Sequence, residues 1–433
     1  MPQSEAWTEG AQLLSQAANI RKEKDAESDK EQEDNVDEQK TKGKRQRASW
    51  HQKSLLERVF QTTQYPDLSQ RSLLASQLGM SPRKIQIWFQ NRRTKEKGKP
   101  TSTEEKVKVI KENKEDVPGT DVNIQNKSGN TLLFIAASMG HTSVSYLLSR
   151  GATQQPNHAG QTPLFAAVQN GHERVVRMLL EHKNGTAPSI NLREFEFGES
   201  ALHMAALMGY GSIVRTLLTQ DGIQINSRDY ENYTPLHHGC INGHREVCDI
   251  LIAHGSDVNA KSSEGFTPLH AATIFGDSAL VDHLLRNGAD VNSLDSKGWS
   301  SLTFAAREGH EQVVLTLLSF KPNIETKTDE GFTPLLVSCC RDRPTIVESL
   351  MTHGAATDIS TSQIQSPVHL ATLTSSRSVL LLLLSRGLDF RIKDTHGKTA
   401  GMVIRPGDQE TKRIFQEHFE KTLYDGGTAF FGE

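Results

Sequence analysis

The sequence has few cysteines and no long apolar run, and both absences limit the class of protein. Its 433 residues include four cysteines and no CxxC pair, which is too few for a secreted scaffold held together by disulfides. The start, MPQSEAWTEGAQ, lacks a basic stretch followed by an apolar one, so no secretory signal is expected. The longest apolar run, Val379 to Leu384, is far shorter than the ~18–20 residues that span a bilayer. We therefore expect a soluble, intracellular protein in a reducing compartment, with no membrane partner.

Motifs that carry enzyme chemistry are also absent. The chain contains no HExxH, GxSxG or P-loop sequence, and each of these motifs places catalytic groups at a fixed spacing. Histidines occupy one slot of a recurring TPLH-like sequence, without a second ligand at metal-binding spacing. We interpret these as hydrogen-bonding structural groups: His203, His237, His270 and His369. The sequence therefore predicts no enzyme, no catalytic residue, no metal site and no cofactor.

Charge is distributed very unevenly along the chain. The whole sequence has a formal net charge of −3, yet residues 41–100 contain fourteen Lys and Arg against three acidic residues. This segment therefore carries a net charge of +11 and leaves −14 for the remainder. A concentrated basic block in an acidic chain indicates a polyanionic partner for that block, and nucleic acid is the first candidate.

The basic block follows a charged tail and contains three helical patterns. Residues 1–40 mix both charge signs without a sustained apolar stripe, so we expect them to be disordered. Capping-box patterns at Ser49 and Asp67 each precede leucines at helical spacing. A third helix is predicted to begin at Ser81, which is followed by a proline at the first helical position. Residues 41–100 therefore form one predicted three-helix unit.

Beyond a polar linker at 101–125, the sequence repeats itself. The Thr or Ser of a recurring turn returns every 33 residues, at Thr234, Thr267, Ser300, Thr333, Ser366 and Thr399. Sequences such as TPLHAA and ALVDHLLRNGADVN follow the turn. This period and these signatures resemble the ankyrin class of solenoid, in which each unit contributes a turn and two helices. The resemblance implies about eight repeats and a degenerate cap over residues 126–404, followed by a C-terminal tail at 405–433.

The third predicted helix of the basic block has two distinct faces. Its apolar face is expected to complete a small core that comprises Leu56, Phe60, Leu74, Ile85, Trp88 and Phe89. The other face is displaced by two residues, about 200° of helical rotation, and consists of Ile87, Gln90, Asn91 and Thr94. Amide side chains can bond adenine N6 and N7 together, and an aliphatic group can touch a thymine methyl. The second face is therefore suited to reading bases in a major groove.

The run WFQNRR at 88–93, followed by TKEK, resembles the third helix of a homeodomain, and the resemblance extends without gaps over about residues 41–100. It implies that the third helix docks in the major groove while an N-terminal arm enters the adjacent minor groove. The residues thereby assigned to bases are Asn91, which bonds an adenine, and Ile87, Gln90 and Thr94. Those assigned to the minor groove are Arg45 and Arg47. Those assigned to phosphates are Tyr65, Arg71, Arg93, Lys95 and Lys97.

These patterns predict an all-α chain: a three-helix homeodomain of the helix-turn-helix type, joined to an ankyrin-repeat solenoid. The arrangement resembles homeodomain regulators that carry ankyrin arrays, of the Wariai type. The first hypothesis is a nuclear transcriptional regulator that reads an A/T-rich, TAAT-like site in double-stranded DNA and binds unidentified proteins through its repeats. The alternative is an ankyrin-repeat adaptor or scaffold whose homeodomain is vestigial. A further hypothesis is that the acidic remainder competes with DNA phosphate for the basic domain.

Aromatic residues in or near the inter-repeat turns are candidate contacts for a protein partner. Large aromatic rings contribute most binding energy where they are buried in an interface. Local packing of the turns is the alternative for every one of them. The candidates are Phe195, Phe197, Tyr230, Tyr233, Phe266, Trp299 and Phe332.

Overall fold

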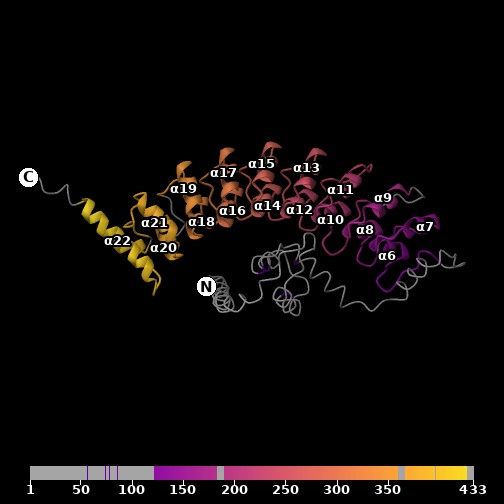
Figure 1. Ribbon diagram of the computed structural model, residues 1–433, viewed down its shortest axis with the longest axis horizontal. Coiled ribbons are helices and arrows are strands. Elements are labelled where there is room, and N and C mark those ends of the chain that lie inside the picture. Colours follow the sequence, from indigo (N-terminus) through magenta and orange to yellow (C-terminus); the bar gives the residue numbers. More distant parts are fainter. Residues whose placement is uncertain are drawn as a thin grey trace, which may run out of the picture. The chain divides into compact units, whose positions relative to one another are not determined.

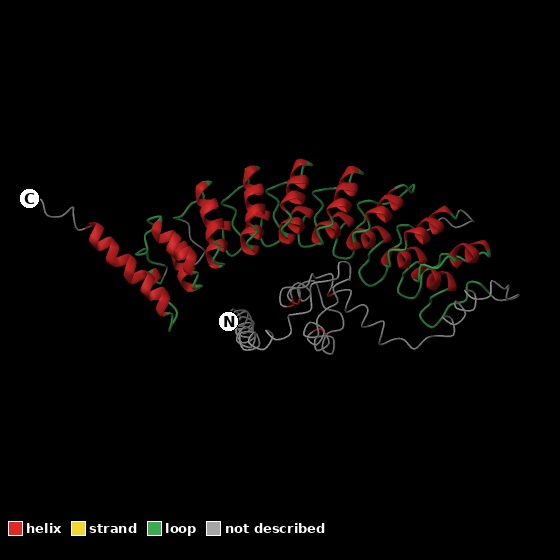
Figure 2. Cartoon of the chain, viewed as in Figure 1, coloured by secondary structure: helices red, strands yellow, loops and turns green. Residues whose placement is uncertain are grey.

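The computed structural model describes most of the chain beyond residue 120. The described residues are 121–182, 190–358, 366–394 and 396–426, together with four isolated positions: Leu56, Leu74, Leu78 and Ile85. The chain divides into two compact units, Met1–Glu96 and Lys97–Glu433. The described secondary structure is helical, apart from isolated bridges between extended residues (Figure 2). The predicted all-α class is confirmed.

Eight pairs of short helices follow one another in the described part of the second unit. The first helices of the pairs are α6 (Leu132–Ser138), α8 (Pro163–Gln169), α10 (Ala201–Met208), α12 (Pro235–Ile241), α14 (Pro268–Phe275), α16 (Ser301–Glu308), α18 (Pro334–Cys340) and α20 (Pro367–Leu373). The second helices are α7 (Ser143–Ser149), α9 (Glu173–Glu181), α11 (Gly211–Leu218), α13 (Arg245–Ala253), α15 (Ser278–Arg286), α17 (Glu311–Ser319), α19 (Pro344–Thr352) and α21 (Arg377–Ser385). Figure 1 shows the first helices as one row and the second helices as another.

A hairpin-like turn precedes each of the first helices from α6 to α18 and sets where that helix begins. In α8 the hydroxyl of Thr162 accepts the backbone N–H of Phe165 at 3.0 Å, and Pro163 occupies the first helical position. This pairing satisfies an otherwise unpaired N–H, and proline has no N–H to leave unpaired. The turn itself needs a left-handed residue, which is usually glycine, but Asn232 with φ 62° takes that place before α12. Asparagine tolerates this conformation better than most residues.

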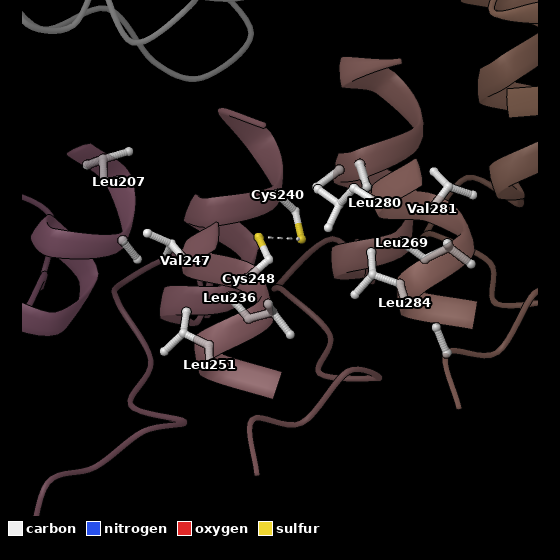
Figure 3. Close-up of a cluster of buried hydrophobic side chains, with 14 of the residues drawn as sticks. Leu207, Leu236, Cys240, Val247, Cys248, Leu251, Leu269, Leu280, Val281 and Leu284 are labelled. Atoms are coloured by element: carbon white, nitrogen blue, oxygen red, sulfur yellow. Dashed lines mark hydrogen bonds between the residues drawn. The ribbon is translucent and has the colours of Figure 1, made fainter. Parts of the chain in front are cut away.

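One apolar core runs through the repeats. It extends from Leu132 to Phe415 and includes residues from both helices of every pair. Figure 3 shows a part of it where leucines of α12 and α13 face those of α14 and α15. Small residues such as Ala271 and Ala272, both buried, allow neighbouring first helices to approach closely. Each repeat therefore buries its apolar surface against its neighbours, as a solenoid requires.

The cysteines in the repeats are free thiols, and three of them, Cys240, Cys248 and Cys339, belong to this core. Cys240 of α12 and Cys248 of α13 are fully buried, with their Sγ atoms 3.7 Å apart. This distance exceeds the ~2.05 Å of a disulfide bond. Burial raises the pKa of Cys240 and of Cys339 well above the usual value of a thiol. Both groups therefore behave as small apolar side chains.

The C-terminal end of the array is closed by additional helical structure. A short 3-10 helix, η1 (Ala400–Val403), follows the last pair, and α22 (Gln409–Gly426) follows η1. Ile414 and Phe415 of α22 are buried against the end of the array. None of the helices in the described part of the chain is both long and apolar enough to cross a membrane.

Candidate DNA interface and partner surfaces

Four residues of the basic segment are described, and three of them belong to its predicted core. Leu56, Leu74, Leu78 and Ile85 are helical and buried. The burial of Leu56, Leu74 and Ile85 confirms three members of the predicted core. The residues predicted to contact DNA lie outside the described residues, and their roles stay predictions: Arg45, Arg47, Tyr65, Arg71, Ile87, Gln90, Asn91, Arg93, Thr94, Lys95 and Lys97.

The histidines of the TPLH slot connect neighbouring repeats. His270 is fully buried, and its Nδ1 accepts the backbone N–H of Thr267 at 3.1 Å. Its Nε2 donates to the carbonyl of Ser293 at 3.0 Å, in the turn that leads to the next repeat. His203 and His237 donate to the carbonyls of Tyr233 and Phe266, which lie later in the following turn than Ser293 does. The fourth histidine of the set, His369, donates in the same way to Lys398. The predicted structural role of these histidines is confirmed.

Burial keeps the imidazoles of His203, His237 and His270 neutral. Desolvation lowers the pKa of His203 and of His237 to about 3, and that of His270 to about 4. Because a carbonyl can only accept, the Nε2 atom must carry the hydrogen, and the Nδ1 atom is then free to accept the turn N–H. The neutral form thus satisfies both partners.

A buried carboxylate holds the turn before α12. Asp229 accepts the N–H groups of Glu231 at 3.0 Å and Tyr233 at 2.8 Å, and it lies 3.0 Å from Nε2 of His238. Burial works against its charge, but the hydrogen bond and charge of His238 hold the pKa of Asp229 below its ordinary value. One carboxylate oxygen of Asp229 thus accepts from the turn, and the other contacts His238. Among the described residues, no group of three or more His, Cys, Asp or Glu side chains could hold a metal ion.

The candidate aromatic contacts divide into exposed and packed residues. Phe195 and Tyr230 are 64% and 56% exposed. In contrast, Tyr233 is only 6% exposed, and its ring lies edge-on to Phe266 at 6.4 Å. Trp299 packs with its ring centroid 5.2 Å from that of Phe304. Local packing of the turns therefore explains the burial of Tyr233, whereas Phe195 and Tyr230 are exposed where a partner could contact them.

A feature that sequence analysis missed is a row of cations at the base of successive turns. Arg193, Arg228 and Lys261 occupy corresponding places before α10, α12 and α14, and all three are exposed. Their spacings of 35 and 33 residues are close to the repeat period. Tracing that period through the charged positions, as well as through the Thr and His positions, could have found them.

Stacked helix pairs joined through hairpin-like turns define an ankyrin-repeat solenoid. A family model described as ankyrin repeats (3 copies) matches residues 102–193, 184–262 and 255–328, and the chain belongs to this family. A second family model, described as homeodomain, matches residues 42–98, so the chain also contains a homeodomain. Homeodomains are DNA-binding domains, and ankyrin arrays are protein-interaction modules. Both are non-enzymatic kinds of domain.

The homeobox proteins and the latrotoxins that resemble this chain are different kinds of protein. Homeobox protein 10 and Homeobox protein Wariai, both from Dictyostelium discoideum, are 54% and 53% identical over 56 and 55 residues. Each match covers 13% of this chain, and 9% and 7% of the respective relative. Alpha-latrotoxin-Lh1a from Latrodectus hasselti is 28% identical over 131 residues, which cover 29% of this chain and 9% of the toxin. The chain thus spans about a tenth of the length of these curated relatives.

Among solved structures, the human ASB11 ankyrin repeat domain matches 50% of this chain and 97% of its own length. The two are 29% identical, with a TM-score of 0.47.

Proposed function

We propose that this protein is a nuclear, sequence-specific transcriptional regulator that binds double-stranded DNA through its homeodomain. The observation that carries the proposal is the homeodomain match at residues 42–98, together with identities of 53–54% to two proteins named homeobox proteins. The net charge of +11 over residues 41–100 is the electrostatic requirement for binding a polyanion.

In this proposal the third helix of the homeodomain reads an A/T-rich, TAAT-like site. Asn91 bonds an adenine edge, and the residues on the same face contact the neighbouring bases. Arg45 and Arg47 enter the minor groove, where A/T-rich sequences present a narrow, strongly negative surface. The residues proposed to hold phosphates set the register without reading sequence.

The ankyrin array serves in this proposal as the protein-interaction module. Its repeats form a continuous core and leave regularly spaced turns at the surface. Such arrays offer an extended surface for other proteins. The homeodomain would thus determine where the protein binds, and the array would determine which proteins it brings there.

The test begins with selection of bound sites from a randomised DNA duplex by the full-length protein. An A/T-rich core should be enriched. The variant Asn91→Ala should then lose about 1–3 kcal/mol at that site and little on unrelated DNA. A matched control, Lys97→Ala, should weaken binding to both duplexes about equally, because it removes a phosphate contact.

Two outcomes would contradict this function. An equal loss on both duplexes for Asn91→Ala would show that Asn91 does not read bases. Absence of an enriched site, together with cytoplasmic retention of a fluorescent fusion of the full chain, would favour an adaptor with a vestigial homeodomain.

A further inference from the structure

Three successive turns carry a cation at their base, and two of these cations, Arg193 and Arg228, are held in place by the backbone of the following repeat. Arg193 donates from Nη1 to the carbonyl of Arg228 at 2.6 Å, and Arg228 donates from Nη1 to the carbonyl of Lys261 at 2.7 Å. Each arginine therefore uses one of its five N–H donors within the array and retains others. Because these side chains are already ordered, less conformational entropy is lost when they bind an anion.

Rings at the tips of two of these turns pack against a glycine of the turn before them. A Cβ atom on Gly160 would come within 2.7 Å of the Phe195 ring, and one on Gly198 would come equally close to Tyr230. The backbone N–H groups of Phe195 and Tyr230 also donate to the preceding turn, both at 2.9 Å. The glycines thus leave room for each ring, while Phe195 and Tyr230 stay more than half exposed.

The same arrangement begins one repeat earlier. A Cβ atom on Gly129 would lie 2.6 Å from the ring of His158, and the N–H of His158 donates to the carbonyl of Ser128 at 3.1 Å. Three successive turns therefore carry a ring that packs against a glycine of the preceding turn. We call the resulting surface the hairpin edge, and it comprises His158, Arg193, Phe195, Arg228, Tyr230 and Lys261.

Rings and cations are in contact along the hairpin edge. The guanidinium carbon of Arg193 lies 5.7 Å from the ring centroid of Tyr230, which belongs to the next turn. The same turns also carry Glu196, Glu231 and Glu264, all exposed, so apolar contact must contribute to binding alongside charge. Tyrosine and arginine are the residues most often found to anchor protein interfaces. A partner that fits this edge offers carboxylates to the cations and apolar side chains to the rings.

We propose that the hairpin edge binds an acidic segment of another protein in which Asp or Glu alternates with large apolar residues. The inference rests on the proposed role of the array as a protein-interaction module and specifies the chemistry of its partner. The acidic character of the rest of the chain, which has a net charge of −14 outside residues 41–100, makes a local row of exposed cations distinctive.

The test uses the full-length protein and a fluorescein-labelled 16-residue probe peptide composed of Asp, Leu and Trp. Binding is followed by fluorescence anisotropy. One control peptide replaces every Asp by Asn, and a second replaces every Leu and Trp by Ser. We expect both to bind at least tenfold more weakly than the probe peptide, because each lacks one of the two kinds of contact.

Paired variants locate the binding surface. Arg193→Glu with Arg228→Glu, and separately Phe195→Ala with Tyr230→Ala, should each weaken binding of the probe peptide at least tenfold. The charge control is Arg174→Glu with Arg245→Glu, which changes the net charge equally at exposed positions of α9 and α13. The ring control is Leu315→Ala with Leu381→Ala, at exposed positions of α17 and α21. Both controls should change the affinity less than twofold, and circular dichroism checks that all variants are folded.

Three outcomes would overturn the inference. Unchanged binding in the hairpin-edge variants would place the peptide elsewhere, for instance on the basic homeodomain, which is intact in every variant. If labelled oligo(dT) binding depended on the hairpin edge and peptide binding did not, the edge would be a surface for single-stranded nucleic acid. The third outcome concerns peptides that the full-length protein selects from a random displayed library. If the hairpin-edge variants bind these peptides with unchanged affinity, the edge is refuted and the interaction function stands. Recovery of no peptide would count against that function itself.

Discussion

At the scale of single residues, the buried histidines show how one side chain can join two repeats. His270 accepts an N–H from its own turn and donates to the carbonyl of Ser293 in the next turn. Only a side chain with an acceptor and a donor on opposite sides of a rigid ring can bridge these two backbone groups. The same slot holds Thr303 in α16, whose hydroxyl contacts that of Ser300. The slot therefore accepts another polar residue, but Thr303 bonds a residue of its own turn and not one of the next turn.

His270→Ala is expected to destabilise the array by about 2–4 kcal/mol, because it creates a cavity and leaves the Ser293 carbonyl unpaired. Urea denaturation followed by circular dichroism measures this loss. His353→Ala is the control, since His353 lies exposed after α19. A similar small effect of both substitutions would mean that the bridge contributes little.

At the scale of elements, α22 is attached to the array through the residue that precedes it. Asp408 accepts the hydroxyl of Ser375 at 2.8 Å, and it also accepts the N–H of Thr411 at 3.1 Å in the first turn of α22. Arg377 donates to the same carboxylate at 3.0 Å. The Ser375 and Thr411 hydrogen bonds hold the pKa of Asp408 far below its ordinary value. One carboxylate thus caps α22 and ties it to the last repeat.

Asp408→Ala should loosen α22 with a cost of about 1–2 kcal/mol, as expected for the loss of a helix cap. Hydrogen exchange should become faster in α22 and in η1, while the repeats that contain α10 to α15 stay protected. Glu410→Ala is the matched control, because the Glu410 carboxylate pairs with Arg413 of its own helix at 2.9 Å. Uniform exchange across the whole array in the Asp408 variant would argue against a local role.

At the scale of the whole molecule, neutral buried histidines make the array sensitive to acid. His203, His237 and His270 have pKa values of about 3 to 4 in the folded chain, against about 6.5 in an unfolded chain. Below about pH 6.5 the unfolded chain therefore binds more protons than the folded chain, and the free energy of unfolding falls as the pH falls. The lowered pKa of Asp229 acts in the same direction at lower pH.

Between pH 6 and pH 5, the three histidines together should reduce the free energy of unfolding by up to about 4 kcal/mol per pH unit, at about 1.4 kcal/mol for each proton. Urea denaturation at a series of pH values measures the slope. The variant His270→Gln should lower the slope by about a third. A free energy of unfolding that does not change with pH in this range would refute the account.

Much of the fold follows from the periodicity of the sequence, but the exposure of individual turn residues does not. Tyr230 and Tyr233 are three residues apart in the same turn, and sequence analysis treats them alike. In the structure one is 56% exposed and the other 6% exposed. The difference arises because Tyr233 packs among the rings of neighbouring repeats, whereas Tyr230 lies on Gly198 of the preceding turn. Such contacts join residues about 30 positions apart.

The sequence by itself determined the two kinds of domain, the all-α class and the structural role of the histidines. It could do so because helix pairs, turns and caps depend on local spacing, and because each repeat presents the same local pattern again. The tertiary structure alone decided which rings stay exposed, how Arg193 and Arg228 are fixed, and how α22 docks. These features depend on backbone groups of the adjoining repeat, and their positions are set only when the repeats stack.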